Sequence, residues 1–207
     1  MLRAPSVIGW LWTAFVVFWL TLAQFNKKAS RNTPALRAAS GGGNAPGHWS
    51  GWGVRLAVLV GALLVLWFHR RGAGGLPASI SRGLPPAPGL AGQWLGVGLC
   101  LAGFGIAFWA RAHLGRNWGM PMSLRQDHEL VTSGPYACVR HPIYTGIMLA
   151  MIGSALAVGI LWLALFVLYF AYFLFSARTE EKMMIAQFPD TYPAYRRRTK
   201  MLIPFVF

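Results

Sequence analysis

Two short polar segments flank a long apolar stretch near the C-terminus, and they hold the residues best suited to chemistry. The first contains Arg140 and His141, and the second contains Glu180 and Glu181. A guanidinium can bind a carboxylate, and a carboxylate can bind an ammonium group. Imidazole and carboxylate groups can also take up a proton. If the two segments meet, they would form a polar site that suits a charged, water-soluble ligand.

The distribution of acidic residues also favours a special role for the Glu180-Glu181 pair. All five acids lie after residue 126, at Asp127, Glu129, Glu180, Glu181 and Asp190. A membrane protein uses basic residues to set its orientation and has no comparable need for acids. We interpret the three isolated acids as solvated surface groups. An ionisable pair at the edge of an apolar block is more typical of a functional group or of an ion pair with a neighbouring Arg178 or Lys182.

The elements that must position these residues are membrane spans. The chain is 56% hydrophobic and only 12% charged. Its apolar residues fall in four blocks, at 6–25, 54–68, 89–110 and 143–177. Because a spanning helix needs about 20 apolar residues, the sequence predicts an all-α, polytopic membrane bundle. A signal peptide is the alternative for the first block, but the basic cluster that follows it favours a retained span.

The last block is too long for one straight crossing, because a helix rises about 1.5 Å per residue and the apolar core is about 30 Å thick. Gly153, Ser154 and Gly159 mark its middle, so we predict a hairpin that turns near 157–159. One long tilted helix is the alternative. The hairpin gives about five spans. Residues 1–110 would then hold three N-terminal spans with loops, and residues 111–207 a cytosolic loop, the hairpin and a tail that form the catalytic region.

The net charge is +14, and the basic residues lie mainly beside the predicted spans. This pattern argues against a nucleic-acid partner and in favour of the positive-inside rule. Most of the basic residues then lie on one side, which places the C-terminus in the cytosol and the N-terminus outside.

A hairpin would return both polar segments to the same cytosolic face. Pro142 can open a helix, whose N-terminus favours an anionic group. Tyr192 and Tyr195, with Phe188, could lie above the site as short pieces broken by prolines. Taken singly, Arg140 could be a membrane anchor, His141 a helix cap and the tyrosines an interfacial belt. Their convergence favours a pocket.

Three stretches resemble one known family. They are LVTSGPYACVRHPIYTG from Leu130, RTEEKMMIAQF from Arg178 and YPAYRRRTKMLIPF from Tyr192, and the stretch from Leu114 adds to them. They look like isoprenylcysteine carboxyl methyltransferases and their bacterial relatives, and phospholipid N-methyltransferases share part of the pattern. Phe188-Pro189 departs from this family's usual Phe-Gly.

The resemblance implies an S-adenosylmethionine-dependent methyltransferase in a bacterial inner membrane. The cofactor would enter from the cytosol, and a lipophilic acceptor, such as an isoprenylcysteine-like carboxylate, would enter from the bilayer. The implied cofactor-binding residues are Leu130, Val131, Gly134, Pro135, Tyr136, His141, Tyr144, Glu180, Glu181 and Tyr195. The implied catalytic residues are Arg140, Glu181 and Arg198, and no metal site is expected.

Four points stay open at this stage. Either Glu180 or Glu181 could contact the cofactor. The acceptor could instead be a phospholipid amine or an unrelated hydrophobic thiol or acid, so O-, N- and S-methylation all stay open. A sterol-type reductase that uses NADPH and a non-catalytic membrane scaffold or lipid-binding protein are the alternative functions. The sequence does not predict an oligomeric state.

Overall fold

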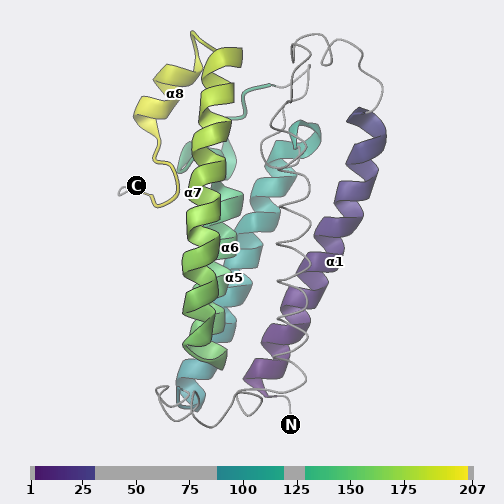
Figure 1. Ribbon diagram of the computed structural model, residues 1–207, viewed down its shortest axis with the longest axis vertical. Coiled ribbons are helices and arrows are strands. Elements are labelled where there is room, and N and C mark those ends of the chain that lie inside the picture. The colour runs from purple at the N-terminus through teal and green to yellow at the C-terminus, as the bar shows by residue number, and fades with distance from the viewer. Residues whose placement is uncertain (1–2, 31–87, 119–128, 205–207) are drawn as a thin grey trace.

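The computed structural model describes residues 3–30, 88–118 and 129–204 (Figure 1). Within these ranges the structure is all helical, and its only β-type pairing is an isolated bridge between Val139 and Lys200. The helices are α1 (Ala4–Ser30), α5 (Leu90–Leu114), α6 (Pro142–Val158), α7 (Leu161–Gln187) and α8 (Tyr192–Arg198), with 3-10 turns η2 (Gly115–Asn117) and η3 (Gly134–Ala137).

Three of these helices are long and apolar enough to cross a membrane. They are α1 over Ala4–Leu22, α5, and α7, while α6 is apolar but shorter, with 17 residues. The first and third apolar blocks are therefore confirmed as candidate spans. The second block, 54–68, lies outside the described residues. The count of five spans and the division after residue 110 remain predictions, and α5 continues past that division to Leu114.

The hairpin predicted for the last apolar block is present. Helix α6 ends at Val158 and α7 begins at Leu161, so the alternative of one long tilted helix is wrong. Gly159 has a φ of 142° between the two helices. A side chain is strained in this conformation, whereas glycine adopts it readily. The hairpin carries both ends of the block back to the same end of the bundle (Figure 1).

Helices α5 and α6 lie unusually close together. A Cβ atom placed on Gly153 would lie 2.5 Å from the carbonyl oxygen of Gly96, and one placed on Gly103 would lie 2.4 Å from that of Gly146. Only a hydrogen atom fits at these positions. We call this contact the glycine seam. Small residues at such an interface allow two helix backbones to approach in a membrane, where close packing drives association.

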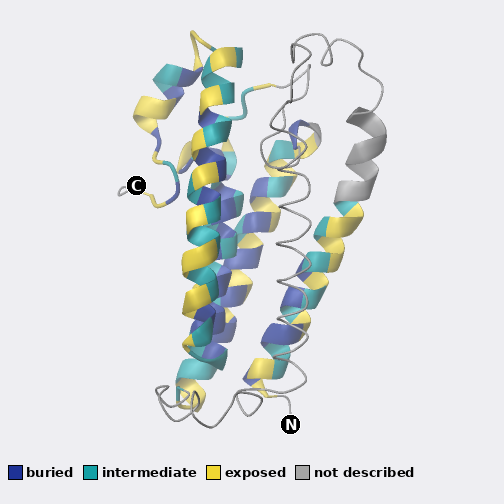
Figure 2. Cartoon of the chain, viewed as in Figure 1, coloured by how far each residue is buried: buried dark blue, intermediate teal, exposed yellow. Residues whose placement is uncertain are grey.

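Helix α1 joins the bundle through aromatic rings. Trp12 packs edge-to-face against Phe104 of α5 at 5.0 Å between ring centroids and stacks on Trp162 of α7 at 5.5 Å. The Trp12 indole also donates a hydrogen bond of 2.8 Å to the Ser154 hydroxyl on α6. One residue of α1 therefore touches all three other long helices. Figure 2 shows buried residues gathered where the helices meet and exposed residues recurring along the outer face of α7.

Candidate active site

Arg140 and His141 lie in the short connection between η3 and α6. His141 is the residue before the helix, with backbone angles φ −126° and ψ 60° that are neither helical nor fully extended, and Pro142 opens the helix as predicted. Proline is favoured at this position because its fixed φ suits a helix and the first backbone N–H has no helical partner. The chain therefore turns into the bundle directly after the two polar side chains.

The C-terminal tail fastens this connection. The backbone N–H groups of Arg140 and His141 donate to the carbonyls of Lys200 and Met201 at 2.8 and 3.1 Å. The hydroxyl of Thr145, one turn into α6, donates to the next carbonyl of the tail at 2.6 Å. We predicted that the N-terminal end of this helix would favour an anionic group. In the structure, the two backbone N–H groups just before the helix are already bonded to the tail.

Glu181 is the centre of a buried ionic cluster. Its carboxylate lies 2.6 Å from Nε of Arg140 and 3.2 Å from Nε of Arg196, and Nε2 of His141 lies 3.6 Å away. The Glu181 side chain is only 4% exposed. A buried carboxylate is tolerated when cations and hydrogen-bond donors surround it. Glu181 therefore already has two arginine partners.

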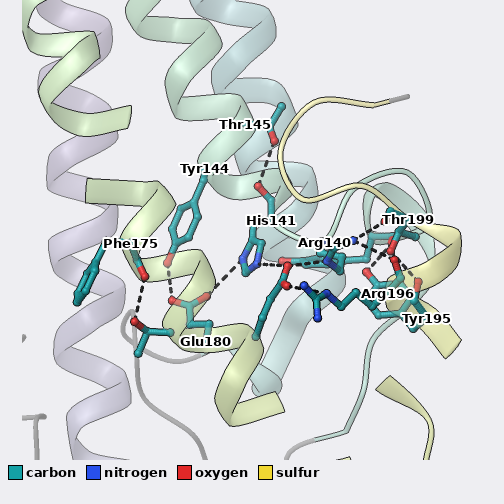
Figure 3. A network of polar contacts seen from close by, with 12 residues as sticks. Arg140, His141, Tyr144, Thr145, Phe175, Glu180, Tyr195, Arg196 and Thr199 are labelled. Carbon is teal, nitrogen blue, oxygen red and sulfur yellow. Dashed lines mark hydrogen bonds and ion pairs between the residues drawn. The ribbon is translucent and has the colours of Figure 1, made fainter. Parts of the chain in front are cut away.

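Glu180 occupies a different position in the same network (Figure 3). The hydroxyl of Tyr144 donates to one of its carboxylate oxygens at 2.5 Å, and Nδ1 of His141 lies 3.4 Å from the other. The Glu180 side chain is 23% exposed, about six times the fraction of Glu181. The structure thus separates the two adjacent carboxylates. Glu181 contacts the two arginines, and the more exposed Glu180 has His141 and the Tyr144 phenol beside it.

The Arg140 guanidinium connects several parts of the site. Besides Glu181, it donates to the backbone carbonyls of Arg196, at 3.2 Å, and of Thr199. Its side chain is 8% exposed. Arg198 lies on the exposed side of α8, and Arg196, two positions earlier, is the arginine that reaches the carboxylate. Arg196 was not among the predicted site residues, because nothing in a run of three consecutive arginines distinguishes one of them.

Aromatic rings and η3 enclose the polar cluster. The imidazole of His141 stacks on the ring of Tyr144, which stacks on Phe173 of α7. Tyr195 donates a hydrogen bond of 2.7 Å to the carbonyl of Tyr136 in η3, and both rings are buried. Four further residues that were expected to bind the cofactor lie in η3 or shortly before it. Pro135 is buried, and Leu130, Val131 and Gly134 are half-buried.

Gly134 has a positive φ of 60°, and a Cβ there would meet the His113 ring at 2.3 Å. Only glycine suits this turn, so the end of α5 packs directly on η3. Through η3, the polar cluster is thereby connected to α5 as well as to the helices and the tail that supply its residues.

The charges of the cluster shift the pKa of His141. Burial by itself lowers that pKa, but the contacts and negative charges of Glu180 and Glu181 outweigh burial and raise it above its usual 6.5. An opposite charge within a few ångströms favours the charged form of a titratable group. Burial raises the pKa of the Tyr195 phenol to about 12. The contacts with Glu180 and Glu181 therefore favour the imidazolium form of His141, and burial favours the neutral phenol of Tyr195.

Residues 95–186 match the family model described as the isoprenylcysteine carboxyl methyltransferase (ICMT) family. This range runs from α5 to the end of α7 and contains Arg140, His141, Glu180 and Glu181.

Curated relatives include a protein-S-isoprenylcysteine O-methyltransferase of Schizosaccharomyces pombe, 36% identical over 39% of this chain and 35% of its own length. The cobalt-zinc-cadmium resistance protein CzcN of Cupriavidus metallidurans is 37% identical over 45% and 44%. The methanethiol S-methyltransferase 2 of Bradyrhizobium diazoefficiens is 35% identical over 55% and 47%. The matched part of the chain thus spans between a third and a half of these relatives.

The fold has a counterpart among solved structures. A eukaryotic intramembrane Ras methyltransferase, ICMT, superposes with a TM-score of 0.50, 16% sequence identity and coverage of 100% of this chain and 99% of the other. At that identity the likeness concerns the fold. Together with the apolar helices, it marks the protein as an integral membrane protein. Residues 95–186, somewhat less than half of the chain, are thus similar to the isoprenylcysteine carboxyl methyltransferase family.

Proposed function

We propose that this protein is an S-adenosylmethionine-dependent methyltransferase that methylates a lipophilic acceptor from within a membrane. The observation that carries the proposal is the position of His141 and Glu180 beside a buried ionic cluster, at the end of an apolar hairpin. A charged cofactor needs the polar end, and a lipid-soluble acceptor needs access from the apolar side. The similarity to this family supports the same reaction class.

The residues present fit the amino-acid part of this cofactor. The carboxylate of Glu180 is partly exposed and can bind an ammonium group. The buried Nε2 atom of His141 has no hydrogen-bond partner among the described residues, so the imidazolium can donate to a carboxylate. The rings of Tyr144 and Tyr136 supply apolar walls. When bound, the cofactor supplies a sulfonium-activated methyl group, and its sulfur recovers the electron pair of the broken carbon–sulfur bond.

The geometry favours different roles for the two glutamates, which the sequence analysis left open. We assign cofactor contact to Glu180, and we assign Glu181 the task of holding Arg140 and Arg196 in place. Arg140 then acts as a positioning residue, because its donors already serve one carboxylate and two carbonyls. A role for Arg198 toward the acceptor remains a prediction, and its exposed side chain leaves its charge available.

The acceptor we propose carries an anionic oxygen or sulfur, with an isoprenylcysteine-like carboxylate as the leading candidate. Relatives are named for methylation of a carboxylate and of a thiol, whereas the resistance protein's name states no reaction. A carboxylate is already ionised at neutral pH and needs no general base, and a thiol would react as its thiolate after losing its proton to water. An amine would have to lose a proton to a group such as Glu180, whose two oxygens already face Tyr144 and His141.

The orientation we propose places the polar cluster in the cytosol of a bacterial inner membrane. The end of α5, the start of α6, the end of α7 and α8 lie at one end of the bundle, whereas α1 begins at the other end (Figure 1). Arg111 is in the last turn of α5, Arg140 precedes α6, Arg178 is in the C-terminal half of α7, and Arg3 precedes α1. An excess of basic residues marks the cytosolic side.

Cofactor binding in detergent tests the proposal. S-adenosylmethionine or its demethylated product should raise the melting temperature, and a ligand at a hundred times its Kd stabilises a protein by about 2.7 kcal/mol. NADPH should have no effect, and stabilisation by NADPH alone would favour a reductase. His141→Ala and Glu180→Gln should abolish the shift. Thr179→Val is the matched control, because the Thr179 hydroxyl bonds only to the Phe175 carbonyl of its own helix.

Transfer of a labelled methyl group then identifies the acceptor class. The panel should contain a prenylated cysteine, a long-chain thiol and a phospholipid amine. We expect the first two to be labelled. Labelling of the amine alone would contradict the proposed acceptor, and the absence of any labelling despite cofactor binding would favour a cofactor-binding scaffold.

A further inference from the structure

A line of polar side chains continues from the site into the apolar part of α7. Tyr172, Ser176 and Glu180 are spaced four residues apart, so they lie along one face of the helix. Glu180 is at the end near the cluster, and the other two lie successively deeper within the candidate span. The Ser176 side chain is completely buried.

The two deeper hydroxyls have no hydrogen-bond partner. The oxygens of Tyr172 and Ser176 are buried, and neither forms a hydrogen bond within the part of the chain that the structure describes. The Ser176 hydroxyl lies beside the Tyr172 phenol, in a side-chain contact that falls short of full hydrogen-bonding geometry. Buried polar groups without a partner are rare in native proteins, because their desolvation is not compensated. Two such hydroxyls side by side indicate a site for a third group.

The surroundings restrict what that group can be. The neighbouring side chains are apolar and include Phe173, Ala177 and Met148. The Tyr172 phenol also interacts with the charge of Glu180, so the hydroxyl pair lies close to the polar cluster. A group that reaches this position would have its polar end beside the cluster and its apolar part among the helices. A lipophilic molecule with one small polar head group meets both conditions.

We infer that the hydroxyls of Tyr172 and Ser176 bind the nucleophilic head group of the acceptor, an anionic oxygen or sulfur. This inference rests on the proposed function and names the part of the site that receives the second substrate. Two hydroxyls can donate hydrogen bonds to the lone pairs of an anion, and the nearby imidazolium of His141 offsets its charge. The aliphatic part of the acceptor would lie along α7, beside apolar side chains such as Phe173 and Ala177.

Steady-state kinetics with both substrates test this assignment. Tyr172→Phe and Ser176→Ala should each raise the KM for the acceptor by about tenfold or more, as expected for loss of one hydrogen bond to a charged group. The Kd of S-adenosylmethionine should stay within about twofold of the wild-type value, because neither hydroxyl belongs to the cofactor's part of the site. Ser176→Thr retains the hydroxyl and should recover most of the affinity, and Thr179→Val on the same helix should change neither constant.

The stability of the empty protein separates this role from a structural one. Since the two hydroxyls have no partner in the folded chain, their removal should leave the melting temperature without acceptor unchanged or slightly raised. A clear decrease in both variants would show that they serve the fold and would overturn the inference. An unchanged acceptor KM in both variants would also overturn it while leaving the proposed function intact. Absence of cofactor binding by the wild-type protein would overturn both.

Discussion

The glycine seam and the polar cluster are two ways of holding the same helix in place. Along the seam, α6 contacts α5 through backbone atoms, and there is no space for a side chain. At the cluster, the N-terminal end of α6 is held by charges and hydrogen bonds from α7, α8 and the tail. The seam tolerates almost no change in volume, whereas the cluster depends on charge. The apolar part therefore fixes where α6 lies, and the polar part fixes what its first residues can bind.

The largest expected effect comes from filling the seam. Gly153→Leu would force α5 and α6 apart, because even a Cβ at this position lies 2.5 Å from a backbone oxygen. Overpacking of this kind costs about 3 kcal/mol or more when backbone has to move. We expect little folded protein, measured as the monodisperse fraction in detergent.

The matched control for the seam is Gly98→Ala, since a Cβ on Gly98 meets nothing within 4 Å. This change should be neutral or stabilise α5 by up to about 1 kcal/mol through helix propensity. Equal damage from both substitutions would show that the seam is not specially close.

The next largest effect tests the centre of the cluster. Glu181→Gln keeps the shape of the side chain but leaves Arg140 and Arg196 without a carboxylate. Breaking a buried pair in this way costs about 3 kcal/mol, which corresponds to a decrease of roughly 6–12 °C in melting temperature for a chain of this size.

Glu180→Gln provides the comparison for Glu181, because the Glu180 side chain is 23% exposed and that of Glu181 only 4%. We expect it to retain stability and lose the cofactor-induced shift. The opposite pattern in the two variants would reverse the roles assigned to the glutamates.

A smaller effect should follow from loosening the tail. Thr145→Val removes the hydrogen bond from the hydroxyl to the carbonyl of Leu202, which is worth about 1 kcal/mol. Cofactor affinity should decrease more than overall stability, because the tail holds the backbone of Arg140 and His141. Thr21→Val on α1, whose hydroxyl bonds only within its helix, should change neither quantity.

The smallest effect concerns pH. The folded-state pKa of His141 is raised, so its contribution to stability is complete below the unfolded value of about 6.5 and is lost as pH rises through the higher folded value. The melting temperature of the wild type should therefore fall, relative to that of His141→Asn, as pH rises above about 6.5 through the higher folded-state pKa. In Glu180→Gln this pH dependence should weaken. An identical dependence in all three proteins would exclude His141 as its source.

Several features of the described fold could be predicted from local sequence patterns. The turn at Gly159 and the helix start at Pro142 were predictable because each depends on a local backbone preference. The meeting of the Arg-His and Glu-Glu segments followed from the hairpin. Which of the two glutamates is buried could not be predicted. Adjacent residues of a helix point in different directions, and tertiary packing decides which direction is covered.

The contribution of Arg196 and the docking of the tail were not predictable either. Three consecutive arginines look alike in sequence, and the one that reaches Glu181 is chosen by the angle at which α8 packs. The pairing of Lys200 with Val139 has no sequence signal, because it is a single bridge between irregular segments. Such contacts depend on tertiary arrangement, which local propensity does not encode.

The docking of residues 200–202 beside Arg140 and His141 also sets an order of assembly during synthesis. Helices α6 and α7 emerge from the ribosome before the tail and can insert as a hairpin, because α5 and both helices of the hairpin have by then been synthesised. The connection before α6 acquires its backbone partners only when the chain has grown about 60 residues further. A nascent protein therefore holds the membrane before its polar cluster is complete, and the cluster matures as a late, separate step of folding.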